Sequence, residues 1–249
     1  MPASADAVAA RAVARAFSRF RSRGAAVAVA LTIAAMFGAH AHAATDPPAP
    51  AQAQTREAVA AYEAGRFDAA LQGFAAAAQK GNRLAQFNYA MMLLRGEGTS
   101  AKPQEALTWL RRAADNQMTH AQFTLGDLNE RGELVPKSLE EANRWYERAA
   151  QGGHTQAQMA LATNYFTGRG VPLDYGRAFT WYSKAAAAGD GGAQYIVGSY
   201  YERGYPGIVD RDIEQAKIWY ARAASHGDPG ALAKLKSLLE EGLRAKSQM

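Results

Sequence analysis

The chain has 249 residues and no cysteine, which excludes disulfide bonds, thiolate nucleophiles and cysteine zinc sites. Histidine is also scarce, and no His-x-x-x-His pair of the kind that binds zinc occurs. The nucleophile motifs Ser-x-x-Lys and Gly-x-Ser-x-Gly are absent, as is a glycine-rich strand-to-helix loop that would hold phosphate. These absences predict a protein that is not an enzyme and that needs no metal and no cofactor.

An excess of positive charge is lacking from most of the chain. The formal net charge is +5, but residues 1–43 contain five arginines and one aspartate, which leaves about +1 for the remainder. A nucleic-acid-binding protein needs a basic face on its folded part. We therefore expect no nucleic-acid partner.

Long apolar runs are lacking as well, apart from residues 25–38 near the N-terminus. This run is shorter than the ~20 residues that a membrane-spanning helix requires. Arginines precede it and small residues follow it at 39–44, which is the pattern of an export signal with a cleavage site. We expect a signal peptide over 1–43, cleaved after Ala43, and a periplasmic product. An uncleaved membrane anchor and a secreted product are the alternatives.

Residues 44–54 are rich in proline and alanine. Pro47, Pro48 and Pro50 are expected to block helix formation and to leave an extended linker. The pattern becomes helical from Thr55 onward, and residues 55–81 are expected to form a first, short unit. With Gly65, Phe67, Ala70 and Phe74 and a shorter turn, this unit resembles a tetratricopeptide unit.

The main part of the chain is an internal repeat. The only four tryptophans are Trp109, Trp145, Trp181 and Trp219, at intervals of 36, 36 and 38 residues. Ala-Gln pairs recur with the same spacing at 85–86, 121–122, 157–158 and 193–194. A period of 20–50 residues is the mark of a repeat protein. The repeats are expected at 82–117, 118–153, 154–189 and 190–227, followed by a capping helix and tail at 228–249.

Each repeat is expected to form two helices. The first begins near the Ala-Gln pair and ends at a glycine, and the second begins after a capping residue such as Ser138, Asp174 or Asp212. Small residues inside the first helix allow a neighbouring helix to approach closely: Ala90, Gly126, Ala162 and Gly198. We expect the tryptophan column to lie in the core, between adjacent repeats.

The best copy of the repeat is residues 157–189. Its pattern consists of Ala157, Gln158, Leu161, Ala162, Tyr165, Gly168, Gly170, Val171, Asp174, Ala178, Trp181, Tyr182, Lys184, Ala185, Ala186 and Gly189. This pattern resembles the Sel1-like repeat, and the resemblance covers residues 82–227. It implies an all-α fold, a right-handed α-solenoid of antiparallel helix pairs with a concave inner surface. It also implies work as an adaptor or scaffold for other proteins.

A second column of residues is a candidate for partner binding. Phe87, Phe123, Met159 and Tyr195 lie two positions before Tyr89, Leu125, Leu161 and Val197, and so on the opposite side of each first helix. They predict an apolar groove that holds a segment of a partner protein. The alternative is that these side chains pack adjacent first helices together. The candidate residues are Phe87, Met91, Leu94, Arg95, Phe123, Asp127, Arg131, Met159, Phe166, Tyr195 and Arg203.

The arginines of this stripe, Arg95, Arg131 and Arg203, share one register near the helix ends. They suit an acidic ligand, or else they are simply solvated. The preferred hypothesis for the whole chain is a non-enzymatic periplasmic adaptor. The alternatives are a cell-wall hydrolase acting on peptidoglycan or β-lactams, and a secreted effector that binds host proteins.

Overall fold

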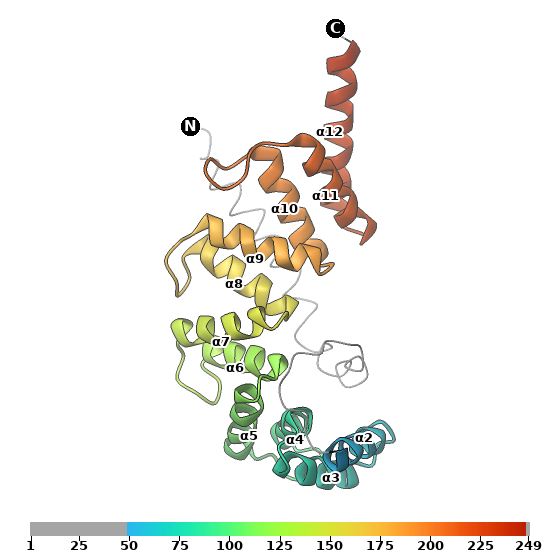
Figure 1. Ribbon diagram of the computed structural model, residues 1–249, viewed down its shortest axis with the longest axis vertical. Helices are drawn as coiled ribbons and strands as arrows, with labels where there is room; N and C mark the ends of the chain where they lie inside the picture. Colours follow the sequence, from blue (N-terminus) through green and yellow to red (C-terminus); the bar gives the residue numbers. More distant parts are fainter. Residues whose placement is uncertain (1–48, 248–249) are drawn as a thin grey trace. The chain divides into compact units, whose positions relative to one another are not determined.

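The computed structural model describes residues 49–247, and these residues form helices and connecting loops (Figure 1). Apart from one isolated bridge between Tyr205 and Val209, the described part of the chain contains no β-structure. The helices are α2 (Ala49–Glu63), α3 (Phe67–Gln79), α4 (Arg83–Arg95), α5 (Pro103–Asp115), α6 (Thr119–Arg131), α7 (Leu139–Gln151), α8 (Thr155–Thr167), α9 (Tyr175–Ala187), α10 (Gly191–Arg203), α11 (Ile213–Ser225) and α12 (Pro229–Ser247). The prediction of an all-α, solenoid-type fold is confirmed. The predicted signal peptide at 1–43 lies outside the described residues.

Consecutive helices pack as pairs, α2 with α3, α4 with α5, α6 with α7, α8 with α9 and α10 with α11. By their contacts the described residues divide into two compact units, 49–154 and 155–247. The first unit contains α2 to α7 and the second contains α8 to α12. No helix among these residues is both long and apolar enough to cross a membrane.

Local sequence signals begin and end the helices as expected. Ser138, Asp174 and Asp212 each accept a hydrogen bond from a backbone amide three residues later, at the start of α7, α9 and α11. At the other end, Gly96 and Gly132 close α4 and α6 with φ angles of 71° and 74°. Only glycine adopts this left-handed conformation at little cost.

The predicted linker is wrong for residues 49–54, because α2 already begins at Ala49. Pro50 is the second residue of this helix, where a missing N–H costs nothing since the amides of the first turn have no partner within the helix. Ala51 and Thr55 are buried, and the Thr55 hydroxyl donates to the Ala51 carbonyl at 2.7 Å. Packing against the following helix therefore favours helix over extended chain here.

In three of the repeats the glutamine of the Ala-Gln pair is bonded to the helix before it. Gln86, Gln122 and Gln194 are buried, and their side-chain amides donate to the carbonyls of Ala78, Ala114 and Ala186. These carbonyls lie near the ends of the preceding helices, where the last four have no partner within the helix. The glutamine thus adds a second hydrogen bond to a carbonyl that also accepts one from a backbone amide, and it links the two helices.

The prediction that the tryptophans lie in the core holds in part. Trp181 is buried, as predicted, whereas Trp109, Trp145 and Trp219 are half-buried. Trp109 and Trp145 still pack against buried core residues. The following residues are at most 2% exposed: Leu110, Tyr146, Tyr182 and Tyr220. Each indole instead carries the cationic group of a residue one turn later, at 4.2–4.6 Å from its centroid: Arg112, Arg148, Lys184 and Arg222. The residue after each tryptophan is therefore the more deeply buried of the two, and three of the four indoles remain partly exposed.

The last helix lies in the segment 228–249 that was predicted as a capping helix and tail, and α12 runs over Pro229–Ser247. Ala231 and Leu238 are buried against α11, but Leu232 and Leu239 are 45% and 48% exposed.

Candidate functional site

The predicted outward stripe does not form one groove, because its members differ in burial. In residues 49–154, Phe87 is 7% exposed and belongs to the core around α4, α5 and α6, so its predicted groove position is wrong. Met91 and Leu94 are half-buried, and Met91 packs against the same core. For these positions the packing alternative holds. Leu125, Leu161 and Val197 are buried as expected. Tyr89 is only half-buried, and its ring meets that of Trp109 edge-on.

Phe123 belongs to a row of packed rings rather than to an open surface. His154 stacks on Phe123 with ring centroids 4.6 Å apart and planes inclined by 16°. His120 meets His154 edge-on at 4.8 Å, and Tyr146 lies 5.6 Å from Phe123. Burial and then the charge of nearby His120 lower the pKa of His154 to about 3, and burial lowers the pKa of His120. Both imidazoles are therefore neutral in the folded protein at pH 7.

The burial of His154 among these rings predicts that the stability of the protein depends on pH. The unfolded chain binds a proton at His154 near the ordinary pKa of 6.5, whereas the folded chain does so only near 3. Stability is thus complete above about pH 6.5 and falls as the pH is lowered toward 3, by up to about 1.4 kcal/mol per pH unit. Urea titrations at pH 8, 6 and 4 measure this loss. His154→Phe keeps the stacking and should flatten the dependence; an identical slope in the variant and the wild type would refute the assignment.

The arginine register separates into paired and unpaired members. Arg131 contacts Asp127 at 2.9 Å, one turn earlier on α6, and Glu133 at 4.0 Å. Arg95 contacts Glu97 at 3.5 Å and donates to the Tyr62 hydroxyl at 3.4 Å. The charges of these two arginines are therefore satisfied within the protein. They give little support to an acidic ligand at those repeats.

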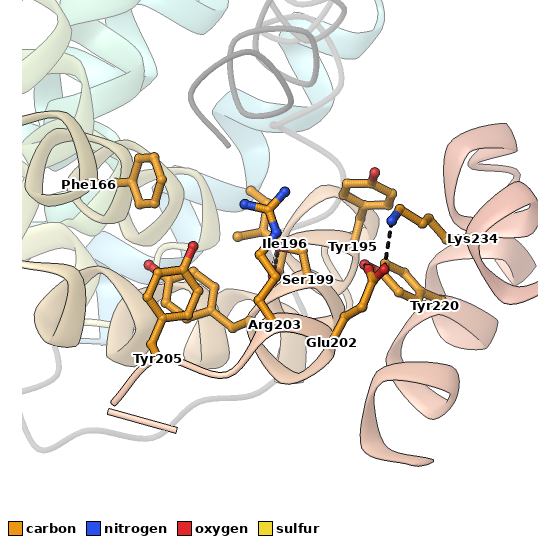
Figure 2. A pocket seen from close by; sticks show the side chains of 10 residues that line it. Phe166, Tyr195, Ile196, Ser199, Glu202, Arg203, Tyr205, Tyr220 and Lys234 are labelled. Atoms are coloured by element: carbon orange, nitrogen blue, oxygen red, sulfur yellow. Dashed lines mark hydrogen bonds and ion pairs between the residues drawn. The ribbon is translucent and has the colours of Figure 1, made fainter. Parts of the chain in front are cut away.

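The second unit contains a pocket that brings together three of the predicted residues, Phe166, Tyr195 and Arg203 (Figure 2). It opens between α8, α10, α11 and α12, with one further wall from the loop after α10. Tyr205 in that loop lies with its ring 4.5 Å from the ring of Tyr200, which is itself buried. Aromatic rings thus form much of the lining. Met159, also predicted, is half-buried on α8 and does not line this pocket.

The other end of the pocket is polar and ordered. The Lys234 ammonium on α12 contacts the Glu202 carboxylate at 2.7 Å, and the Tyr220 hydroxyl donates to the same carboxylate at 2.5 Å (Figure 2). Burial alone would raise the pKa of Glu202, but these two hydrogen bonds and the nearby positive charges outweigh it and lower that pKa. Glu202 is therefore ionised and its charge is balanced by Lys234.

Arg203 is different from its counterparts. All three arginines are exposed, but no carboxylate of residues 49–247 forms an ion pair with Arg203. In Figure 2 its guanidinium extends between Phe166 on one side and Tyr195 on the other. The pocket thus combines aromatic walls with one cation that forms no ion pair, although its charge helps to lower the pKa of Glu202.

Sequence reasoning missed Lys234 and Tyr205 as lining residues. Lys234 lies 32 residues beyond Glu202, and Tyr205 lies in the repeat with the two-residue insertion, so no repeat register connects them to the stripe. One sequence signal did point to this pocket. Ser199 stands where the second repeat has Asp127, so the fourth repeat lacks the carboxylate that lies one turn before the arginine. Among the described residues, no group of three or more histidine, aspartate or glutamate side chains is arranged to hold a metal ion.

Comparison with known proteins identifies the repeat. The family model of the Sel1 repeat matches residues 83–118, 119–154, 155–190 and 192–228, each beginning one or two residues after the predicted boundary. A Sel1 repeat protein from Oxalobacter formigenes is 33% identical with a TM-score of 0.64, over 69% of this chain and 49% of that one. A protective antigen from uropathogenic Escherichia coli strains, described as having an SLR fold, is 22% identical with a TM-score of 0.50, over 94% of this chain and 57% of the antigen. The chain thus spans about half the length of both solved structures.

No curated protein matches the chain. Repeats of the Sel1 type act as protein–protein interaction scaffolds and are in general not catalytic.

Proposed function

This chain belongs to the Sel1 repeat family, and from this premise we propose that it is a periplasmic adaptor that binds a segment of a partner protein and catalyses no reaction. The observation that carries the proposal is the pocket of the second unit. There Phe166, Tyr195 and Arg203, three members of the outward stripe, line one pocket, in which Phe166 is buried, Tyr195 is half-buried and Arg203 is exposed. Aromatic and arginine side chains around a pocket are typical anchors of protein interfaces.

The periplasmic location is supported by the sequence of residues 1–43. Arginines, a short apolar run and small residues follow one another in the order of an export signal. In the envelope a scaffold of this kind would hold a signalling or assembly component rather than modify it. Fractionation of cells into cytoplasm, periplasm, membranes and medium tests the location, and recovery from the medium would favour the secreted alternative.

We expect the Tyr195→Ala variant to lose a specific partner. Tyr195 and Tyr201 make a matched pair on α10, since both are half-buried and both pack against the core of α11 and α12. Only Tyr195 lines the pocket. In crosslinking pull-downs from the cell envelope, Tyr201→Ala should recover the same partner as the wild type, and Tyr195→Ala should recover several-fold less. Equal recovery by both variants would show that the pocket does not bind the partner.

A further inference from the structure

The four repeats place different residues at one position of the first helix, and this difference decides where a positive charge is free. The position is occupied by Met91, Asp127, Thr163 and Ser199. In the second repeat Asp127 neutralises Arg131 one turn later, at 2.9 Å. The fourth repeat has Arg203 at the same spacing from Ser199, whose hydroxyl donates to the Ile196 carbonyl instead. The serine leaves Arg203 without the carboxylate that its counterpart has.

The charges around Arg203 add to a net positive pocket. Glu202 is the acid in the lining, and Lys234 and Tyr220 both bind its carboxylate. Lys234 therefore offsets Glu202, and the charge of Arg203 remains. A guanidinium binds a carboxylate through two parallel hydrogen bonds, which makes this group its natural partner.

The rings beside the guanidinium limit the kind of acid that fits. Phe166 and Tyr205 line one side of the pocket and Tyr195 lines the other (Figure 2). An apolar or aromatic side chain next to the carboxylate would bury surface against these rings. A phosphate group is recognised by clusters of arginine, whereas this lining has one unpaired cation.

We propose that the pocket around Arg203 is a binding site for a protein segment in which a carboxylate is followed by an aromatic or large apolar residue. The inference rests on the proposed function, because it takes the ligand to be a segment of a partner protein. It adds the chemistry that selects this partner. Ser199 is the residue that determines the specificity, since it keeps the guanidinium available.

The test uses the purified full chain and fluorescein-labelled peptides in fluorescence-polarisation titrations. The reference peptide is Gly-Ser-Glu-Phe-Gly-Ser with a C-terminal amide, and its partners carry glutamine for glutamate, alanine for phenylalanine, or phosphoserine for glutamate. A further peptide, Gly-Ser-Gly-Ser-Phe with a free C-terminus, asks whether a terminal carboxylate can replace the side chain. We expect the glutamate peptide to bind about 10- to 100-fold more tightly than the glutamine peptide, as for loss of one charge-assisted hydrogen-bonded pair. Removing the phenylalanine ring should also weaken binding.

Variants of two residues make the test specific. Arg203→Gln should abolish the preference for glutamate over glutamine. Ser199→Asp gives Arg203 an internal partner, as in the second repeat, and should abolish the same preference although the arginine remains. In Ser199→Asn the new side chain has the shape of aspartate without its charge, so this variant should retain the preference for glutamate. The preference should also decrease with added salt, since Arg203 is exposed.

Three results would overturn the proposal: no preference for glutamate, an unchanged preference in Arg203→Gln, or tighter binding of the phosphoserine peptide. Its failure is separable from that of the proposed function. If the envelope partner is lost in Tyr195→Ala but recovered fully by Arg203→Gln, the adaptor role stands and the carboxylate site falls. If no partner depends on Tyr195 while the glutamate peptide still binds through Arg203, the site stands without the adaptor role.

Discussion

Tyr146→Ala is expected to lower the free energy of unfolding by about 3–5 kcal/mol, the usual cost of removing a buried aromatic ring. Tyr146 is 2% exposed, its ring packs near Phe123, and its hydroxyl donates to Glu130 at 2.7 Å. The substitution would leave a cavity between α6 and α7 that the two helices can only partly close. Burial also raises the pKa of Tyr146, so its hydroxyl keeps its proton and remains a donor at any ordinary pH.

Trp145→Ala provides the matched comparison on the same helix. Trp145 is half-buried and carries the Arg148 guanidinium on its outer face at 4.5 Å from the ring centroid. Removing this ring takes away less buried apolar surface than removing Tyr146, and it leaves no closed cavity. We therefore expect the free energy of unfolding to fall by only about 1–2 kcal/mol. Urea titrations followed by far-ultraviolet circular dichroism measure both values. A larger loss for Trp145→Ala than for Tyr146→Ala would contradict the assignment of the buried column.

Gly126→Ala is expected to destabilise the protein by about 1–3 kcal/mol, although alanine is the better helix former by up to about 1 kcal/mol. The reason is the close approach of α6 and α7. A Cβ atom at Gly126 would lie 2.5 Å from atoms of the Tyr146 ring, well inside van der Waals contact. That ring is held by Phe123 and by the hydrogen bond to Glu130, so it has little freedom to move.

Gly176→Ala is the control for the change in helix propensity. Gly176 lies in the first turn of α9, and the nearest neighbours of an added Cβ are Asp174 Oδ1 at 3.4 Å and Ile208 Cγ1 at 3.9 Å. We expect an unchanged or slightly raised stability. The double variant Gly126→Ala with Tyr146→Ala should lose less than the two single variants together, because the alanine then meets no ring. Strict additivity would argue against the contact as the cause.

The sequence alone determined the class of fold and the units of which it is built. The spacing of the tryptophans and the Ala-Gln pairs identified the repeats, and the caps Ser138, Asp174 and Asp212 lie where the pattern placed them. Such features are local, since a helix and its ends depend on residues within a few positions of one another. The pairing of Arg131 with Asp127 is equally local, since two residues four apart meet on one helix face, but the sequence pattern had predicted both as partner-binding residues.

Only the tertiary structure decided which column is buried and where the pocket opens. Periodicity places Trp145 and Tyr146 side by side on one helix, but the rotation of α7 against α6 decides which of them meets Gly126. In the same way Phe87 and Tyr195 share a register, yet Phe87 is covered by its neighbours and Tyr195 lines an open space. Lys234 reaches Glu202 across 32 residues, a contact that no repeat period encodes. Burial and pocket chemistry depend on how separate helices pack, whereas the repeat pattern describes each helix by itself.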